Sequence, residues 1–190
     1  RWRDEITDLA TIEGLVLPYG LGRSYGDSCL NDGGTLLDMV LLNRFIAFDE
    51  ESRLLRCEAG VTLANILKLT VPRGWFLPTT PGTKFVTVGG AIAKDVHGKN
   101  HHRAGTFGCH VARFELLRSN GERLICSPDE NANLFRATIG GLGLTGMITW
   151  AELRMRRVAG PFIAKEQIRF RCLDEFFDLN AESDERFEHT

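Results

Sequence analysis

The placement of glycine constrains this chain most, because glycines cluster at three points where predicted strands and helices meet. The first cluster, Gly20 to Gly26, follows a predicted buried strand over residues 14–18. Glycines there permit positive φ angles and let a ligand approach the backbone, so that successive N–H groups form a cradle for an anion. Arg23 and Ser24 add a cation and a hydroxyl donor suited to a pyrophosphate. The pattern predicts a nucleotide-binding loop, with a plain surface turn as the alternative.

Two common nucleotide-binding fingerprints do not fit these glycines. One residue breaks Gly-x-Gly-x-x-Gly in the first cluster, and no helix is predicted after it. Residues 141–146 do match Gly-x-Gly-x-x-Gly, but they lead into a predicted strand over residues 147–155, where the Rossmann fold requires a helix. The only Gly-Lys pair, at residues 98–99, is followed by Asn100 instead of the Ser or Thr of a P-loop.

A third cluster combines small residues with a helix start. A helix is predicted over residues 86–96, with Thr87 as its cap, and its first turn, Gly89 to Ala91, carries almost no side-chain bulk. Such a start lets a phosphate or a flat ring lie against bare backbone. The turn over residues 81–83 precedes it.

Histidines follow at once, and they leave a metal site open as an alternative. Four of the five histidines lie within residues 97–110, and His97 and His101 have the i, i+4 spacing of two ligands on one helix face. Gly98 and Asn100 are poor helix formers, however, and no acidic third ligand lies between Lys99 and residue 110. The pattern therefore favours polar roles near a cofactor, or loop histidines without a role, over metal binding.

The rest of the chain predicts an α+β fold, because strands and helices mix without strict alternation. Strands are predicted over residues 35–39, 45–48 and 54–58, a hairpin over 111–118 and 123–126, and helices over 63–69 and 131–138. Gly160-Pro161 marks a boundary, followed by a predicted strand over residues 163–170 and a helix that includes residues 184–190.

Composition excludes several function classes. The 23 basic and 25 acidic residues are interspersed, which argues against nucleic-acid binding. No apolar run approaches the roughly 20 residues of a transmembrane helix. The five cysteines include no Cys-x-x-Cys, which favours reduced thiols and a cytoplasmic location over disulfides or zinc.

Five segments in one order resemble the FAD-linked oxidases of the vanillyl-alcohol oxidase/p-cresol methylhydroxylase (PCMH) type: residues 20–27, 81–83, 88–93, 97–102 and 140–146. The resemblance implies a PCMH-type FAD-binding domain of two α/β lobes, residues 1–60 and 61–158. It also implies that residues 159–190 are the truncated start of a separate C-terminal substrate domain.

The same resemblance implies the site residues. The residues implied to hold the pyrophosphate are Gly20, Gly22, Arg23, Ser24 and Tyr25. Those implied to line the flavin and adenosine path are Pro81, Gly82, Thr83, Gly89, Gly90, Ala93 and His97, with Gly146 closing the adenine side. Lys99 matches a residue of the substrate pocket, so His97 and Lys99 are the catalytic candidates. Arg23 replaces the histidine through which many relatives attach the flavin, which implies non-covalent FAD.

The implied function is an FAD-dependent oxidoreductase acting on a CH–OH group of a sugar or sugar-alcohol derivative. Hydride would pass from the substrate carbon to flavin N5 while a base removes the hydroxyl proton. The implied substrate is a small-molecule or lipid-linked sugar, and the electron acceptor is not specified. The alternatives are a non-catalytic FAD- or nucleotide-binding fragment and a metal-dependent hydrolase built on the histidine cluster.

Overall fold

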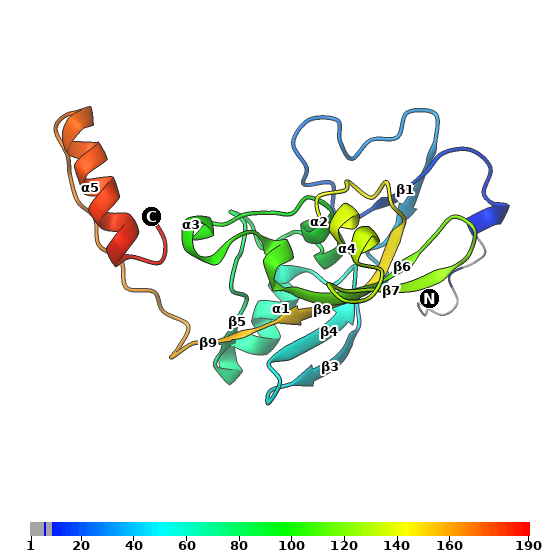
Figure 1. The fold of residues 1–190 in the computed structure, drawn as a ribbon, viewed down its shortest axis with the longest axis horizontal. Helices are drawn as coiled ribbons and strands as arrows, with labels where there is room; N and C mark the ends of the chain where they lie inside the picture. Colours follow the sequence, from blue (N-terminus) through cyan, green and yellow to red (C-terminus); the bar gives the residue numbers. More distant parts are fainter. Residues whose placement is uncertain (1–5, 7–8) are drawn as a thin grey trace.

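A five-stranded antiparallel sheet forms the centre of the computed structural model, which describes residue 6 and residues 9–190 (Figure 1). The strand order is β3-β4-β8-β6-β7, so the longest strand, β8, lies in the middle. The strands are β3 (Phe45–Asp49), β4 (Leu54–Glu58), β6 (Val111–Leu117), β7 (Arg123–Cys126) and β8 (Met147–Arg154). The predicted hairpin of β6 and β7 and the predicted strand β8 are confirmed.

Alternation along the strands separates an apolar face from a charged face. Helices α1 (Leu63–Thr70), α2 (Val88–Ala93) and α4 (Ala132–Thr138) share one buried core with the apolar face. Phe114 of β6 stacks on Phe135 of α4, with ring centroids 5.3 Å apart. On the other face, Glu152 of β8 lies between Arg56 of β4 and Arg113 of β6.

Two threonine side chains cap helices, and the cap predicted at Thr87 is confirmed. The Thr62 hydroxyl accepts a hydrogen bond from the Asn65 N–H at the start of α1, and the Thr87 hydroxyl accepts one from the Gly90 N–H at the start of α2. Each bond satisfies an N–H group that has no partner inside its helix. Helix α2 is shorter than predicted, because Lys94 already ends it.

A second, smaller sheet pairs β1 (Val16–Tyr19) with β2 (Thr35–Asp38) in parallel. The predicted strand before the first glycine cluster is therefore present, but it continues past Pro18 to Tyr19. A separate apolar cluster of Met39, Leu42, Leu117 and Met147 lies between this pair and the main sheet. The main sheet contains β3 and β4 from the first predicted lobe and β6 and β8 from the second. The predicted lobe boundary near residue 60 stays a prediction.

Several short elements complete the fold. Strands β5 (Trp75–Phe76) and β9 (Arg156–Arg157) form a two-stranded antiparallel sheet. Helix α3 (His101–Ala104) and the 3₁₀ turn η4 (Phe107–His110) precede β6 along the chain. Two further 3₁₀ turns are η2 (Leu9–Thr11) and η3 (Val71–Arg73).

The last part of the chain stands apart from the main sheet in Figure 1, where helix α5 (Leu173–Arg186) lies at the far left. The predicted strand over residues 163–170 is wrong: the segment has no regular secondary structure, and no strand of the described chain pairs with it. The predicted helix over residues 184–190 is only partly right, because α5 ends at Arg186. That residues 159–190 begin a substrate domain stays a prediction. None of the described helices has the length and apolar character needed to cross a membrane.

Candidate functional site

The loop after β1 presents a row of unused backbone donors. The N–H groups of residues 20–26 donate no hydrogen bond to any other described residue. Gly22 and Gly26 have φ angles of 60° and 59°, a left-handed conformation that other residues rarely adopt. A side chain at Gly22 would also collide with the Tyr19 hydroxyl. The loop therefore curves with its amide groups free, which is the arrangement that an anion can bind.

Helix α2 forms the second wall. Gly20 lies so close to this helix that a Cβ atom on it would stand 2.5 Å from the Thr87 hydroxyl oxygen. The Gly89 N–H donates to the Ala59 carbonyl (2.8 Å), which fixes the first turn against the end of β4. Gly90 is exposed, and Ala93 lies one turn further on, so this side of the helix offers little bulk to a ligand.

The loop over residues 140–146 forms the third wall. It is tied to the end of α2 by bonds from the Gly140 N–H to the Ile92 carbonyl and from the Leu142 N–H to the Ala93 carbonyl. Gly146 has a φ of 145° and leads directly into β8. This connection explains why the Gly-x-Gly-x-x-Gly match is not a Rossmann loop: the loop ends in a strand, as predicted.

Together these walls line an open groove with two adjoining parts. Both parts are lined by Gly20, Thr87, Gly90 and Ala93. Of the predicted cofactor-binding residues, the groove brings together Gly20, Gly22, Arg23, Ser24, Gly89, Gly90, Ala93 and Gly146. Three segments that are distant in the sequence thus meet at one site.

The groove suits an anionic ligand. Among the described residues, no aspartate or glutamate lines either part. Arg23 is exposed and forms no hydrogen bond or ion pair within the described chain, so its guanidinium is available. Lys94 lines the larger part and donates to the Ser28 hydroxyl. Sequence reasoning missed Lys94 and Ser28, since it did not predict that α2 ends at Lys94 or that the loop after Gly26 folds back toward it.

A second pocket brings together four other predicted residues: Pro81, Gly82, His97 and Lys99. His97 and Lys99 are exposed on its wall, while Gly98 between them is buried. The groove and this pocket adjoin along the chain, because Val96 lines the groove and His97 lines the pocket. Asp184, in the last turn of α5, also lines this pocket.

Two predicted residues lie outside both cavities. The Tyr25 side chain is 98% exposed, and it lines neither the groove nor the pocket. The Thr83 hydroxyl accepts a hydrogen bond from the Phe85 N–H (3.2 Å), which stabilises the turn. That these two residues bind the cofactor stays a prediction.

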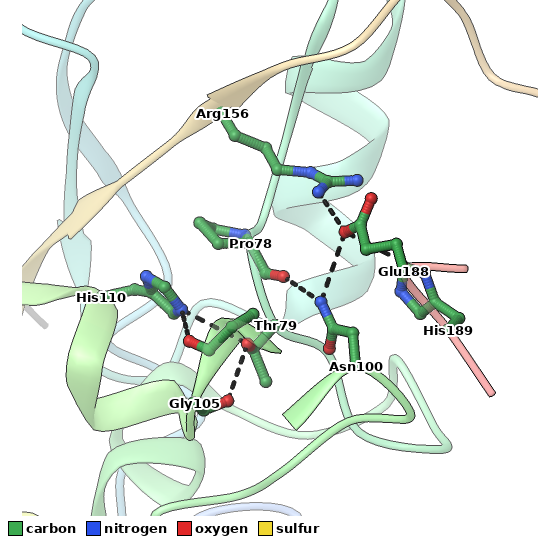
Figure 2. A network of polar contacts seen from close by, with 9 residues as sticks. Pro78, Thr79, Asn100, Gly105, His110, Arg156, Glu188 and His189 are labelled. Carbon is green, nitrogen blue, oxygen red and sulfur yellow. Dashed lines mark hydrogen bonds and ion pairs between the residues drawn. The ribbon is translucent and has the colours of Figure 1, made fainter. Parts of the chain in front are cut away.

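Two buried polar side chains fix the loop that carries Pro81 (Figure 2). Asn100 donates from Nδ2 to the Pro78 carbonyl (2.8 Å), and the Thr79 hydroxyl donates to the Gly105 carbonyl (3.1 Å). His110 Nε2 lies 2.9 Å from the Ala104 carbonyl, which requires a proton on Nε2. Burial lowers the pKa of His110, the largest effect, although the Ala104 carbonyl raises it. His110 is therefore a neutral structural residue.

The histidines do not form a metal centre. The rings of His97 and His101 lie with centroids 5.5 Å apart, edge to face. Within the part of the chain that the structure describes, no group of three or more His, Cys, Asp or Glu side chains is arranged to hold a metal ion. The hydrolase alternative thus finds no ligand set among these residues.

Free loop amides, a small-residue helix start and a groove without carboxylates are the features of a nucleotide-binding domain, here of mixed α/β structure. Comparison with known proteins agrees: residues 5–127 match the family model described as "FAD binding domain". The chain belongs to this PCMH-type FAD-binding family of flavoprotein oxidoreductases.

Named relatives refine the comparison. The chain is 44% identical over 171 residues to decaprenylphosphoryl-β-D-ribose oxidase of Mycolicibacterium smegmatis, covering 90% of this chain and 37% of the relative. It is 31% identical over 117 residues to human Δ(24)-sterol reductase, covering 62% of this chain and 23% of the relative. It is 30% identical over 135 residues to a putative D-arabinono-1,4-lactone oxidase of Neurospora crassa, covering 70% of this chain and 24% of the relative. The chain thus spans only about a quarter to two fifths of the length of these relatives.

Proposed function

We propose that this chain binds FAD non-covalently in the groove and forms the cofactor-binding part of an oxidoreductase that acts on a CH–OH group of a sugar. The observation that carries the proposal is the row of unused N–H groups over residues 20–26. A row of free amides beside an unpaired guanidinium and a lysine is suited to a pyrophosphate. The family to which the chain belongs supports FAD as the nucleotide.

The shape of the groove fits this cofactor at the residues that face it. Gly20 and Gly22 have no room for a side chain, because a Cβ atom would meet Thr87 or Tyr19. The loop amides together with Arg23 and Ser24 would hold the two phosphates. Gly89, Gly90 and Gly146 would let the flat parts of the cofactor approach the backbone. Arg23 has no nucleophilic atom at its end, so a covalent bond to the flavin is not expected at this position.

The second pocket would receive the substrate. When bound, FAD would supply a hydride acceptor at flavin N5. His97 and Lys99 are exposed titratable groups on the pocket wall. A ring nitrogen of His97 would take the proton of the substrate hydroxyl, and the ammonium of Lys99 would stabilise negative charge that develops nearby. A sugar substrate is supported by the names of the ribose and lactone oxidases among the relatives.

The test is the visible absorption spectrum of the purified protein before and after acid precipitation. We expect flavin bands, with the yellow colour released into the supernatant because the cofactor is not covalently bound. Arg23→Met should weaken FAD binding on the order of tenfold, since one charge-assisted contact is lost. Arg169→Met is the matched control, because Arg169 is exposed in the segment before α5 and does not line the groove.

Two outcomes would contradict the proposal. A folded protein that is colourless and does not bind added FAD would refute the cofactor. FAD that binds but is not reduced by any sugar or sugar alcohol would favour the alternative of a binding fragment without turnover.

A further inference from the structure

One side chain joins the glycine loop after β1 to the opposite wall of the groove. Lys94, at the end of α2, donates a hydrogen bond from Nζ to the Ser28 hydroxyl. An ammonium group only donates, so the Ser28 oxygen accepts this bond and gives its own proton to the Tyr25 carbonyl (3.1 Å). The connection therefore runs from α2 through Ser28 into the turn that carries the free amides.

This bond is the one polar tie between the loop and the rest of the domain. Within the described chain, no other hydrogen bond or ion pair links residues 20–29 to another segment. The base of the loop is anchored further on, where Asn31 donates from Nδ2 to the carbonyls of Leu15 (3.0 Å) and Thr35 (3.1 Å). The position of the loop over the groove thus depends on a single side-chain contact.

The lysine end of the contact is fixed. Just before Lys94, the Ala93 carbonyl accepts a hydrogen bond from the Leu142 N–H (2.9 Å). Just after it, the Asp95 carboxylate accepts one from the Gly108 N–H (2.8 Å). Because both neighbours of Lys94 are held by the body of the domain, the loop is the part whose position this contact determines.

The contact also lies where the nucleotide is proposed to bind. Lys94 and Ser28 both line the larger part of the groove, together with Arg23 and Ser24. A loop that is already held in its binding conformation binds more tightly, because less conformational entropy is lost when the ligand arrives. A contact that holds residues 20–29 in place therefore favours binding of an anion by their amides.

We propose that Lys94 is a positioning residue for the nucleotide: through Ser28 it holds the loop against α2 before the cofactor binds. The inference rests on the proposed function, because it deepens the same nucleotide site. Lys94 acts through Ser28 and not as a direct ligand of a phosphate. Removal of either side chain therefore has the same consequence.

The first test uses the full chain without any cofactor. Arg23 is exposed within the loop, so the rate at which trypsin cleaves after Arg23 reports how often the loop opens. We expect Lys94→Met and Ser28→Ala each to raise this rate roughly threefold to tenfold, because a charge-assisted hydrogen bond near the surface is lost. Cleavage after Arg53, which is exposed in the turn between β3 and β4, is the internal reference.

The second test is a fluorescence titration with FAD. Lys94→Met and Ser28→Ala should weaken FAD binding by similar factors, and the double variant should be no weaker than either single one, because both changes remove one contact. Lys94→Arg and Ser28→Thr keep the donor and the acceptor, so they should retain both the affinity and the resistance to trypsin. Lys84→Met is the matched control, since Lys84 lies over the Phe85 ring, outside the groove, and should change neither measurement.

Circular dichroism shows whether each variant is folded, and Ser28→Ala, at an exposed position, keeps the test valid if Lys94→Met is not. Losses of affinity that add in the double variant would mean that Lys94 contacts the nucleotide itself, which would overturn the positioning role. Cleavage after Arg23 that neither single variant changes would also overturn it. The two proposals fail separately: a protein that binds no FAD, but whose loop opens in both single variants, would refute the cofactor while the role of Lys94 in holding the loop stands.

Discussion

The charged face of the main sheet allows a prediction whose size follows from its geometry. Glu152 is 7% exposed on the central strand, and its cross-strand partners are Arg56 on β4 and Arg113 on β6. Arg56 donates to Oε1 from Nη2 (2.8 Å) and Nε (3.1 Å), and Arg113 donates to Oε2 from Nε (2.8 Å). One carboxylate therefore joins three strands.

Glu152→Gln keeps the shape of the side chain and removes its charge. A hydrogen bond to a charged group contributes about 1.5–3 kcal/mol, and exposed ion pairs contribute about 0–1 kcal/mol. Because the arginine side chains are 32% and 43% exposed, we expect a loss of about 2 kcal/mol in total. For a chain of this length, that lowers the melting temperature by roughly 4–8 °C. Glu182→Gln is the control: this residue forms an exposed pair with Arg186 on α5 and should shift the melting temperature by about 1–2 °C at most.

The stabilisation of the fold by Glu152 should also depend on pH. Burial raises the pKa of Glu152, but the hydrogen bonds from Arg113 and Arg56 outweigh burial and lower it below 4.5. A lowered pKa in the folded state means that the stabilisation is fully present above pH 4.5 and disappears as pH falls through the folded-state pKa. Thermal denaturation at pH 7 and at decreasing pH should show wild type and variant converging below pH 4.5. Equal melting temperatures at pH 7, or a gap that persists at low pH, would refute the reasoning.

Two further predictions follow from the groove and the core. Thr87→Val removes the cap of α2 at the groove wall and should cost about 1 kcal/mol of stability and also weaken FAD binding in a fluorescence titration. Thr62→Val removes the equivalent cap of α1 and should cost the same stability without changing FAD affinity; equal losses of affinity in both variants would contradict the assigned wall. Burial raises the pKa of the Cys57 thiol to about 12, so Ellman's reagent at pH 8 should modify Cys109 and Cys172 in the folded protein and reach Cys57 only after unfolding. Rapid native labelling of Cys57, mapped by mass spectrometry, would show that the core opens.

The sequence alone determined the features that depend on neighbouring residues. Thr62 and Thr87 cap their helices because a hydroxyl reaches an N–H group three residues later, whatever the rest of the chain does. The loop at Gly20 to Gly26 keeps its amides free because glycine permits the left-handed φ angles of Gly22 and Gly26. The order of its glycine segments was also enough to predict the FAD-binding family.

Tertiary structure decided which of these segments share a cavity. Hydrogen bonds between the loop at Leu142 and the end of α2 bring Gly146 to the groove, whereas His97 and Lys99 face a different pocket. Lys94 enters the site only because α2 ends there, a boundary that the pattern of small residues did not predict.

Strands and surface positions depended on tertiary structure in the same way. Residues 163–170 have the composition of a strand but no partner in the described chain, and a strand exists only where another one pairs with it. Tyr25 belongs to the binding loop in the sequence, yet its side chain points to solvent. Local hydrogen bonds are encoded by residues a few positions apart, while pockets and strand pairs depend on segments that meet only after the whole domain has packed.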